Sequence, residues 1–332
     1  MFLIRVTAIG CVACGSSPSP LSGTDAARPA TDAREIDAGS GSCVAPSPSQ
    51  DCAAPLAPGD SRTCTLTVAG TERTYLVYAP ATYDPCKPAA LMVDAHGSNE
   101  TAQMQAGTAT FLGFPANYGS GMRLVADREG FLVVEPQGIG DAWSESDVAF
   151  MGQIPAQIPA TLDPTRVFLS GISNGAGLTY WGACALAMYT GFAPVSGYDD
   201  SPCASPTTAS LVHFHTTTDA LVSYSDGQAA FAKWTAARHC TADSSTTFGT
   251  GSTDTRAWCV SAAEPWALQP CGDAPATTCD RYTCDGGTRA MFCTVPEETQ
   301  YDGGVFGGHV LYFNKTHLSL AAVTWQFLTQ GF

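Results

Sequence analysis

The sequence predicts an α/β fold in which a mostly parallel sheet is covered by helices on both faces. Short, continuous apolar runs recur along the chain, and such runs are typical of strands buried on both sides. Helical candidates lie between successive runs, and strand–helix–strand units with right-handed crossovers give parallel neighbours. A chain of 332 residues fits one large domain with a tail better than two equal domains.

The expected elements follow from the periodicity of the apolar residues. An antiparallel pair is expected first, because apolar and polar residues alternate on either side of the turn 69–72, at 64–68 and 73–78. Buried strands are expected at 90–95, 131–135, 167–170, 193–196, 211–215 and 291–295. Helices are expected at 121–128, 175–189, 228–238 and 318–328.

Three segments outside this pattern define the domain organisation. Residues 1–14 are apolar, carry one Arg and end in small residues before Cys14, so they resemble a bacterial lipoprotein export signal with Cys14, or else Cys11, as the lipidated residue. Residues 15–50 are rich in Ser, Pro, Gly, Ala and Asp and indicate a flexible linker. Within the main domain, residues 51–332, the segment 247–288 reads as a Cys-rich insertion before the last strand.

Composition limits the partners and the compartment. With 15 Lys plus Arg against 30 Asp plus Glu, the net charge is −15, which disfavours nucleic acid and anionic membranes as partners. No later stretch reaches about 18 uninterrupted apolar residues, so no membrane span is expected. Oligomeric state is left open.

Cysteine usage indicates export. Twelve of the 14 cysteines follow Cys14 and form an even set, as expected for disulfides outside the reducing cytoplasm. A zinc site is the alternative, but the only C-x-x-C is the pair Cys11 and Cys14, so we expect no metal and no cofactor. The expected location is the extracellular space or the outer surface of a bacterial cell.

The motif Gly171-Ile172-Ser173-Asn174-Gly175 carries the strongest chemical signal. It follows an expected strand and opens an expected helix, and flanking glycines allow a serine to occupy such a crowded turn. A serine hydroxyl becomes a nucleophile only when a base accepts its proton and a carboxylate orients that base. Ser173 is therefore the candidate nucleophile, and the alternative is a structural turn with an unreactive serine.

In α/β-hydrolases, where a serine motif of this kind links a strand to a helix, the acid and the base follow the nucleophile in the order Ser, Asp or Glu, His, so both are expected after Ser173. His309, in a loop between the last strand and the last helix, is the candidate base, and His317 is interpreted as a surface or capping residue. Asp219 follows the strand 211–215 and is the candidate acid. Its rivals are the adjacent pair Asp199 and Asp200.

Acyl transfer also requires donors for the developing oxyanion, each contributing roughly 3 kcal/mol to the rate. The backbone N–H of Asn174 follows the nucleophile and is one candidate. The backbone N–H of Ser98, in the loop after strand 90–95, is the other. His96 in the same loop is expected to lock the loop rather than to carry protons.

Together these stretches resemble the polyhydroxybutyrate depolymerase and feruloyl esterase family of α/β-hydrolases. The resemblance runs from about residue 73 to the C-terminus and is carried by residues 75–80, 96–98, 126–131, 163–167, 171–175, 215–219 and 307–309. It implies an α/β-hydrolase fold and a serine carboxylesterase acting on esters of extracellular polymers. It also implies that Trp143 lines the acyl or aryl pocket, whereas the residues alone allow ordinary loop packing.

Two departures from the family put the substrate in doubt. Pro155 is expected to interrupt the helix that precedes the serine strand. The Cys-rich insertion is expected to cover or narrow the substrate cleft. Two other functions stay open: a polymer-binding surface protein without catalysis, and a serine peptidase on the same fold.

Overall fold

The computed structural model describes residues 43–110, 119–201, 203–253, 256–261, 267–296, 308–314 and 316–330. The expected signal, with Cys11 and Cys14, and residues 15–42 of the expected linker lie outside the described residues. The described residues belong to one compact unit, Cys43–Phe332.

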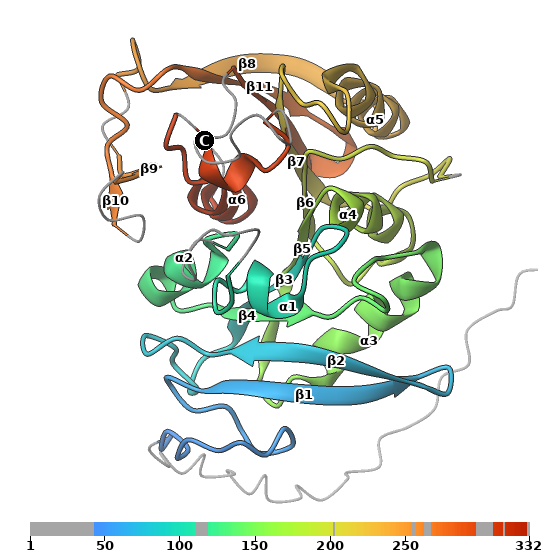
Figure 1. Ribbon diagram of the computed structural model, residues 1–332, viewed down its shortest axis with the longest axis vertical. Helices are drawn as coiled ribbons and strands as arrows, with labels where there is room; N and C mark the ends of the chain where they lie inside the picture. Colours follow the sequence, from blue (N-terminus) through green and yellow to red (C-terminus); the bar gives the residue numbers. More distant parts are fainter. Residues whose placement is uncertain are drawn as a thin grey trace, which may run out of the picture. The chain divides into compact units, whose positions relative to one another are not determined.

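One large sheet organises this unit (Figure 1). Its ten described strands, in spatial order, are β1 (Ser61–Val68), β2 (Thr71–Tyr78), β4 (Leu132–Pro136), β3 (Ala89–Ala95), β5 (Leu162–Ile172), β6 (Gly191–Val195), β7 (Ser210–Thr216), β12 (Arg289–Val295), β11 (Thr277–Thr283) and β8 (Thr241–Phe248). Strands β4 to β12 in this order are parallel to their neighbours, and antiparallel strands flank them on both sides. This is the α/β-hydrolase arrangement, so the predicted fold is confirmed.

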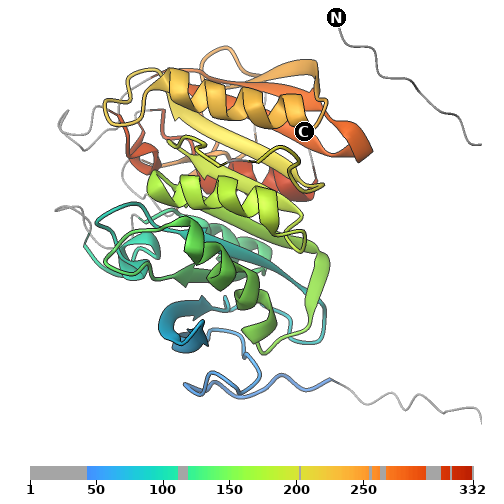
Figure 2. The same ribbon diagram turned by 90° about the vertical axis from the view of Figure 1, so that its right-hand side faces the viewer.

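Helices cover both faces of the sheet. On one face lie α2 (Met122–Glu129) and α6 (Leu320–Thr329), and on the other lie α3 (Val148–Gln157), α4 (Asn174–Ala185) and α5 (Tyr224–Ala237), which face the viewer in Figure 2. Shorter helices are α1 (Ala102–Gln105), η1 (Glu145–Asp147), η2 (Asp285–Gly287) and η3 (Leu311–Phe313). None of the described helices is long and apolar enough to cross a membrane.

The hydrophobic core is divided by the sheet into two clusters. Strand β3 shows the division: Leu91 and Val93 pack toward α3 and α4, whereas Ala90 and Met92 pack toward α2 and α6. Successive side chains of a strand point to opposite faces. Both faces of β3 are buried, and this is why its sequence is an unbroken apolar run.

Several element boundaries differ from the sequence-based expectation, and strands β8 and β11 were not expected. The first turn is shorter than 69–72, because Ala69 and Gly70, with φ of 48° and 83°, suffice for a tight hairpin of the kind that matches strand twist. Helix α4 ends at Ala185 rather than near 189. Helix α6 begins at Leu320, capped by the Ser319 hydroxyl, so His317 precedes the helix instead of opening it.

The expected interruption at Pro155 is wrong. Helix α3 continues through Pro155 to Gln157. Proline lacks the N–H that would donate to the carbonyl four residues earlier, at Met151. The buried hydroxyl of Tyr189 donates to that carbonyl oxygen instead, over 2.8 Å, so the missing hydrogen bond is replaced from outside the helix.

The twelve cysteines after Cys14 form six disulfides, as the even count predicted. The pairs are Cys43–Cys86, Cys52–Cys64, Cys184–Cys203, Cys240–Cys284, Cys259–Cys271 and Cys279–Cys293. Closing such loops stabilises the fold by restricting the unfolded chain.

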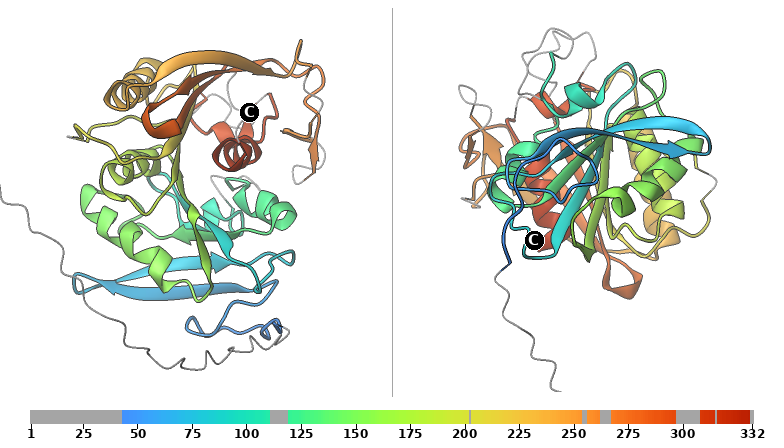
Figure 3. Two further views of the ribbon diagram at one scale, coloured as in Figure 1. Left: turned by 180° about the vertical axis from the view of Figure 1, so that it is seen from behind. Right: turned by 90° about the horizontal axis from the view of Figure 1, so that it is seen from below.

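The Cys-rich segment 247–288 is integrated into the domain. It supplies β11 to the main sheet and a small hairpin of β9 (Cys259–Val260) and β10 (Leu268–Gln269), which lies beside α6 in Figure 3. The hairpin binds the segment before α6, since Val260 N–H donates to His317 O over 2.7 Å and Ser319 N–H donates to Trp258 O over 2.8 Å. Its described contacts therefore brace the chain between His309 and α6.

The hydrogen bond from the Tyr189 hydroxyl to Met151 O can be tested by mutation. We expect Tyr189→Phe to lower the free energy of unfolding by about 1–3 kcal/mol, because a buried carbonyl loses its donor. Adding Pro155→Ala restores a backbone N–H to the same carbonyl, so the double variant should lose less than Tyr189→Phe alone. Urea unfolding of the four proteins measures this coupling.

Tyr198→Phe, at a tyrosine that is 44% exposed, is the matched control and should leave stability nearly unchanged. Strictly additive effects of the substitutions at Tyr189 and Pro155 would contradict the proposed exchange of donors.

Candidate active site

Ser173 stands on a sharp turn between β5 and α4. Its φ and ψ are 56° and −117°, a conformation that costs a non-glycine residue about 1–3 kcal/mol. The turn is held in place because Ser173 N–H donates to Val195 O of β6 over 2.9 Å, and Ser173 O accepts from Ala176 N–H over 3.0 Å. This is the geometry of a nucleophile elbow, in which the side chain is presented at the carboxyl edge of the sheet.

The glycines of the motif are required by close backbone approach. A Cβ on Gly171 would lie 2.5 Å from Gly175 O, and a Cβ on Gly175 would lie 2.5 Å from both Ala95 O and His96 O. The start of α4 is therefore packed directly on the loop that follows β3. Because Ala95 pairs with Gly171 across neighbouring strands, Ser98 and Asn174 belong to adjacent segments at the same edge.

Asp219 and His309 are brought together although 90 residues separate them. Asp219 follows β7, His309 follows β12, and these parallel strands end side by side, with Val295 opposite Thr216. The His309 Nδ1 lies 2.8 Å from Asp219 Oδ2. An imidazole that donates from Nδ1 to a carboxylate keeps Nε2 as its acceptor, which is the form that a general base requires.

The Asp219 carboxylate is out of solvent but well supplied with donors. Its Oδ1 accepts from the N–H groups of Leu221 and Val222, both over 2.9 Å, and its Oδ2 lies 3.3 Å from His215 Nε2. Burial raises the pKa of this carboxyl, but the hydrogen bonds from His215 and His309 outweigh it and hold the pKa well below its usual range. Asp219 is therefore ionised at neutral pH.

The rival residues are engaged elsewhere. Asp199 forms an ion pair with Lys233 over 3.0 Å, and Asp200 accepts from the Trp181 indole N–H over 2.9 Å. His317 lies half-buried before α6, where its backbone pairs with β9. Of the alternatives weighed in the sequence, Asp219 and His309 are the pair in direct contact.

His96 and Trp143 tie three loops together at this edge. His96 Nδ1 donates to Gly97 O over 2.7 Å, and its Nε2 accepts from Gly138 N–H over 3.0 Å, so the ring locks its loop as expected. Burial lowers the pKa of His96 and keeps it neutral. Trp143 is 5% exposed, stacks obliquely on His96 and donates its indole N–H to His96 O over 2.7 Å.

The side chain of Asn174 extends this network. It exchanges two hydrogen bonds with the backbone of Trp143, one from Trp143 N–H over 2.5 Å and one to Trp143 O over 3.1 Å. Asn174, the residue after Ser173, is thereby fixed to the loop that carries Trp143. The described contacts of Trp143 are those of a packing residue, and a contact with substrate stays a prediction.

Two buried carboxyl groups lie behind the loop after β3. Glu100 accepts from Gly97 N–H over 2.9 Å, and Asp94 accepts from the Ser170 hydroxyl over 2.5 Å. Burial raises the pKa of Glu100 to about 7 and that of Asp94 to about 6. The protonation of Glu100 therefore bears directly on the loop that contains Ser98.

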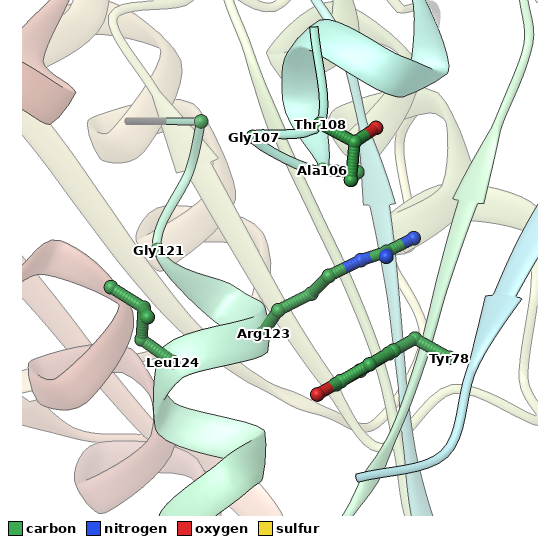
Figure 4. Close-up of a pocket in the computed structure, with 8 residues that line it drawn as sticks. Tyr78, Ala106, Gly107, Thr108, Gly121, Arg123 and Leu124 are labelled. Carbon is green, nitrogen blue, oxygen red and sulfur yellow. The ribbon is translucent and has the colours of Figure 1, made fainter. Parts of the chain in front are cut away.

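Two cavities among the described residues lie close to the elements that form the candidate site. One, of about 470 Å³, is lined by residues of the loops after β6 and β7, including Tyr198 and Leu221. The other, of about 480 Å³, lies beside α2 (Figure 4). There Arg123 extends over the ring of Tyr78 and pairs with Glu135 through two contacts of 2.8 Å, so its charge is already neutralised.

The residues predicted for the site do not line this second cavity. Among the residues that the structure describes, no group of three or more His, Cys, Asp or Glu side chains is arranged to hold a metal ion.

Sequence reasoning missed the residues that lie behind Asp219. His215 contacts Asp219, His213 contacts His215, and Tyr180 of α4 contacts His213. A signal was present, because His213 and His215 alternate on one strand and must share a face. The contact with Tyr180, 33 residues away, depends on the tertiary structure.

Comparison with known proteins gives partial matches. No protein-family profile matches the chain. The bifunctional acetylxylan esterase/xylanase XynS20E of Neocallimastix patriciarum is 28% identical over 188 residues, which are 53% of this chain and 26% of that protein. This chain therefore spans about a quarter of the length of that relative.

Solved structures with a similar arrangement include esterases. The acetyl xylan esterase from Aspergillus awamori has a TM-score of 0.46 at 15% identity, with 70% of this chain and 92% of that chain covered. A thermostable esterase has a TM-score of 0.44 at 16% identity, with 54% and 52% covered. Est1E from Butyrivibrio proteoclasticus has a TM-score of 0.41 at 10% identity, with 52% and 84% covered.

The raised pKa of Glu100 predicts a pH-dependent stability. The native state holds a proton that the unfolded chain releases above 4.5, so this carboxyl lowers the free energy of unfolding as pH rises from about 4.5 to about 7. Glu100→Gln removes this contribution. We expect the stability of Glu100→Gln relative to wild type to increase by about 3 kcal/mol between pH 5 and pH 8.

Urea unfolding at both pH values measures this difference. Glu72→Gln, at an exposed glutamate of β2, is the control and should show a nearly constant difference from wild type. A constant difference for Glu100→Gln as well would rule out the raised pKa.

Proposed function

We propose that the protein is a serine carboxylesterase with Ser173 as nucleophile, His309 as general base and Asp219 as the acid that orients the histidine. The observation that carries the proposal is the hydrogen bond between His309 Nδ1 and Asp219 Oδ2 at the sheet edge where the Ser173 turn also ends. A strained serine turn and an oriented imidazole at one edge are what nucleophilic acyl transfer requires.

The proposed reaction proceeds in two acyl transfers. The Ser173 Oγ attacks the ester carbonyl carbon while His309 Nε2 accepts the hydroxyl proton. The tetrahedral intermediate collapses, the alcohol leaves with that proton, and an acyl-enzyme remains on Ser173. Water then attacks the acyl carbonyl with His309 again as base, and the acid product leaves as Ser173 regains its proton.

Asp219 contributes by staying ionised. A carboxylate that accepts from four donors has little tendency to take the proton of His309, so it orients the ring and stabilises the imidazolium. The N–H groups of Ser98 and Asn174 are proposed as the oxyanion donors. This assignment is supported by the packing of the α4 start on the loop after β3.

The proposed substrate is an ester of an extracellular polymer. The exposed apolar side chains Ile139, Tyr198 and Leu221 occupy loops after β4, β6 and β7 at the carboxyl edge, and they suit a large, uncharged surface. The relative named for acetylxylan esterase activity favours acetyl groups on a polysaccharide. Polyhydroxybutyrate-type polyesters and feruloyl esters remain part of the proposal, with Trp143 beside the acyl group.

The proposed location is outside the cytoplasm. Six disulfides in the described domain support export, because such bonds are rare in reducing compartments. Export through the signal at residues 1–14, with a lipid anchor at Cys14, is the corresponding proposal for the N-terminus.

A hydrolysis panel tests the function. We expect the purified protein to hydrolyse p-nitrophenyl acetate and to release acetate from acetylated xylan. Methyl ferulate and polyhydroxybutyrate emulsion, each assayed separately, test the two alternative substrate classes. Ser173→Ala should lower kcat by roughly a million-fold, because the acyl-enzyme can no longer form. Its thermal unfolding midpoint should stay close to that of wild type.

Ser170→Ala, at the neighbouring serine that bonds Asp94, is the matched control and should keep most of the activity. Full turnover by Ser173→Ala would end the proposal. Cleavage of peptides but not of esters would indicate a peptidase, and binding to polymer without turnover would indicate a binding protein.

A further inference from the structure

Two histidines of β7 lie directly behind Asp219. His213 and His215 are fully buried, and their rings stack at 8° with centroids 5.3 Å apart. His213 Nε2 lies 3.0 Å from His215 Nδ1, and His213 Nδ1 lies 2.7 Å from the Tyr180 hydroxyl. At the other end, His215 Nε2 lies 3.0 Å from Val222 O and 3.3 Å from Asp219 Oδ2.

The surroundings hold both rings in these orientations. Helix α5 leaves room for His215 only because residue 227 is glycine, since a Cβ on Gly227 would lie 2.1 Å from His215 Nδ1. Tyr224 meets His215 edge-on at 6.0 Å between centroids, and Phe292 of β12 stacks on His213 at 5.0 Å. The four-group chain from Tyr180 to Asp219 is therefore built into the packing of α4, α5, β7 and β12.

The acceptors at the Asp219 end of this four-group chain fix where its hydrogens lie. Val222 O and the ionised Asp219 only accept, so His215 Nε2 carries the hydrogen. Burial and the neighbouring His215 lower the pKa of His213 well below its usual value, so His213 is neutral. Only one of the two facing nitrogens can carry a hydrogen, and we place it on His213 Nε2, which donates to His215 Nδ1, while His213 Nδ1 accepts from the Tyr180 hydroxyl. Every hydrogen of the chain then points toward Asp219.

We propose that Tyr180, His213 and His215 form a hydrogen-bond relay that fixes the Asp219 carboxylate, with His215 as a positioning residue for His309. The inference rests on the proposed function, because it concerns the proposed catalytic acid. Asp219 Oδ2 lies 2.8 Å from His309 Nδ1 and 3.3 Å from His215 Nε2, whose single hydrogen it shares with Val222 O, so the relay ends on the oxygen that orients the base. A second donor on that oxygen also weakens its attraction for the protonated His309.

The titratable groups that face the relay come from each element packed against it. They are Tyr180 of α4, Tyr224 of α5, and Asp219 and His309 at the sheet edge. Asp199 acts at longer range, where its charge adds to burial in raising the pKa of Tyr180. The direct effect of His215 is thus expected on Asp219 and, through it, on His309.

The first test reads the protons without using activity. In the intact protein labelled with ¹⁵N-histidine, the ring nitrogen shifts at pH 7 should show the hydrogen of both His213 and His215 on Nε2 and none on Nδ1. Tyr180→Phe should perturb the His213 ring shifts most and those of His215 next. A hydrogen on Nδ1 of either ring would overturn the relay.

The second test separates positioning from packing. His215→Met removes the donor to Asp219, whereas His215→Gln keeps a donor at a similar reach. We expect His215→Met to lower kcat/KM for p-nitrophenyl acetate by ten- to a hundredfold in order of magnitude, and to raise the acid-limb pKa of kcat/KM by roughly half a unit. His215→Gln should recover most of the rate and the wild-type pH profile.

Equal losses in the two variants at similar unfolding midpoints, or an unshifted acid limb in His215→Met, would overturn the positioning role. An inactive wild type that shows the expected histidine tautomers would instead overturn the proposed function while supporting the relay. The two ideas therefore fail in different measurements.

Discussion

The ionised carboxylate of Asp219 is the group on which the candidate site depends. A carboxylate removed from solvent is costly unless donors surround it, and this one receives two backbone N–H groups and two imidazoles. Those donors come from its own loop, from β7 and from the chain after β12. The parallel pairing of β7 with β12, which sets Val295 opposite Thr216, is what places them around one side chain.

The Ser173 side of the candidate site depends on close packing instead of charge. Ser173 keeps a strained conformation because β6 binds its N–H and because glycines let α4 approach the loop after β3. Asn174, Trp143 and His96 then link α4 to the loops after β3 and β4 through four hydrogen bonds whose partners all lie at the carboxyl edge. A rigid edge of this kind suits a reaction that needs fixed donors.

The disulfide-rich part of the chain stabilises the segment that carries His309. Cys279–Cys293 joins β11 to β12, the strand that precedes this segment, and Cys259–Cys271 closes the hairpin that binds residues 317 and 319 after it. His309 therefore lies between two braced regions of the chain. The expectation that the Cys-rich segment covers or narrows the substrate cleft stays a prediction. The described hydrogen bonds of its hairpin are with the chain before α6.

The sequence by itself predicted the α/β fold, eight of the ten strands of the large sheet, the serine turn and the even set of disulfides, since these follow from local periodicity, turn chemistry and the cysteine count. Chain order also singled out Asp219 and His309, whose catalytic roles stay a prediction. Only the tertiary structure decided that α3 continues through Pro155, because the replacement donor comes from Tyr189. It also decided the disulfide pairs and the chain from Tyr180 to Asp219. Such contacts join residues far apart in sequence, and no local pattern specifies which distant group completes a hydrogen bond.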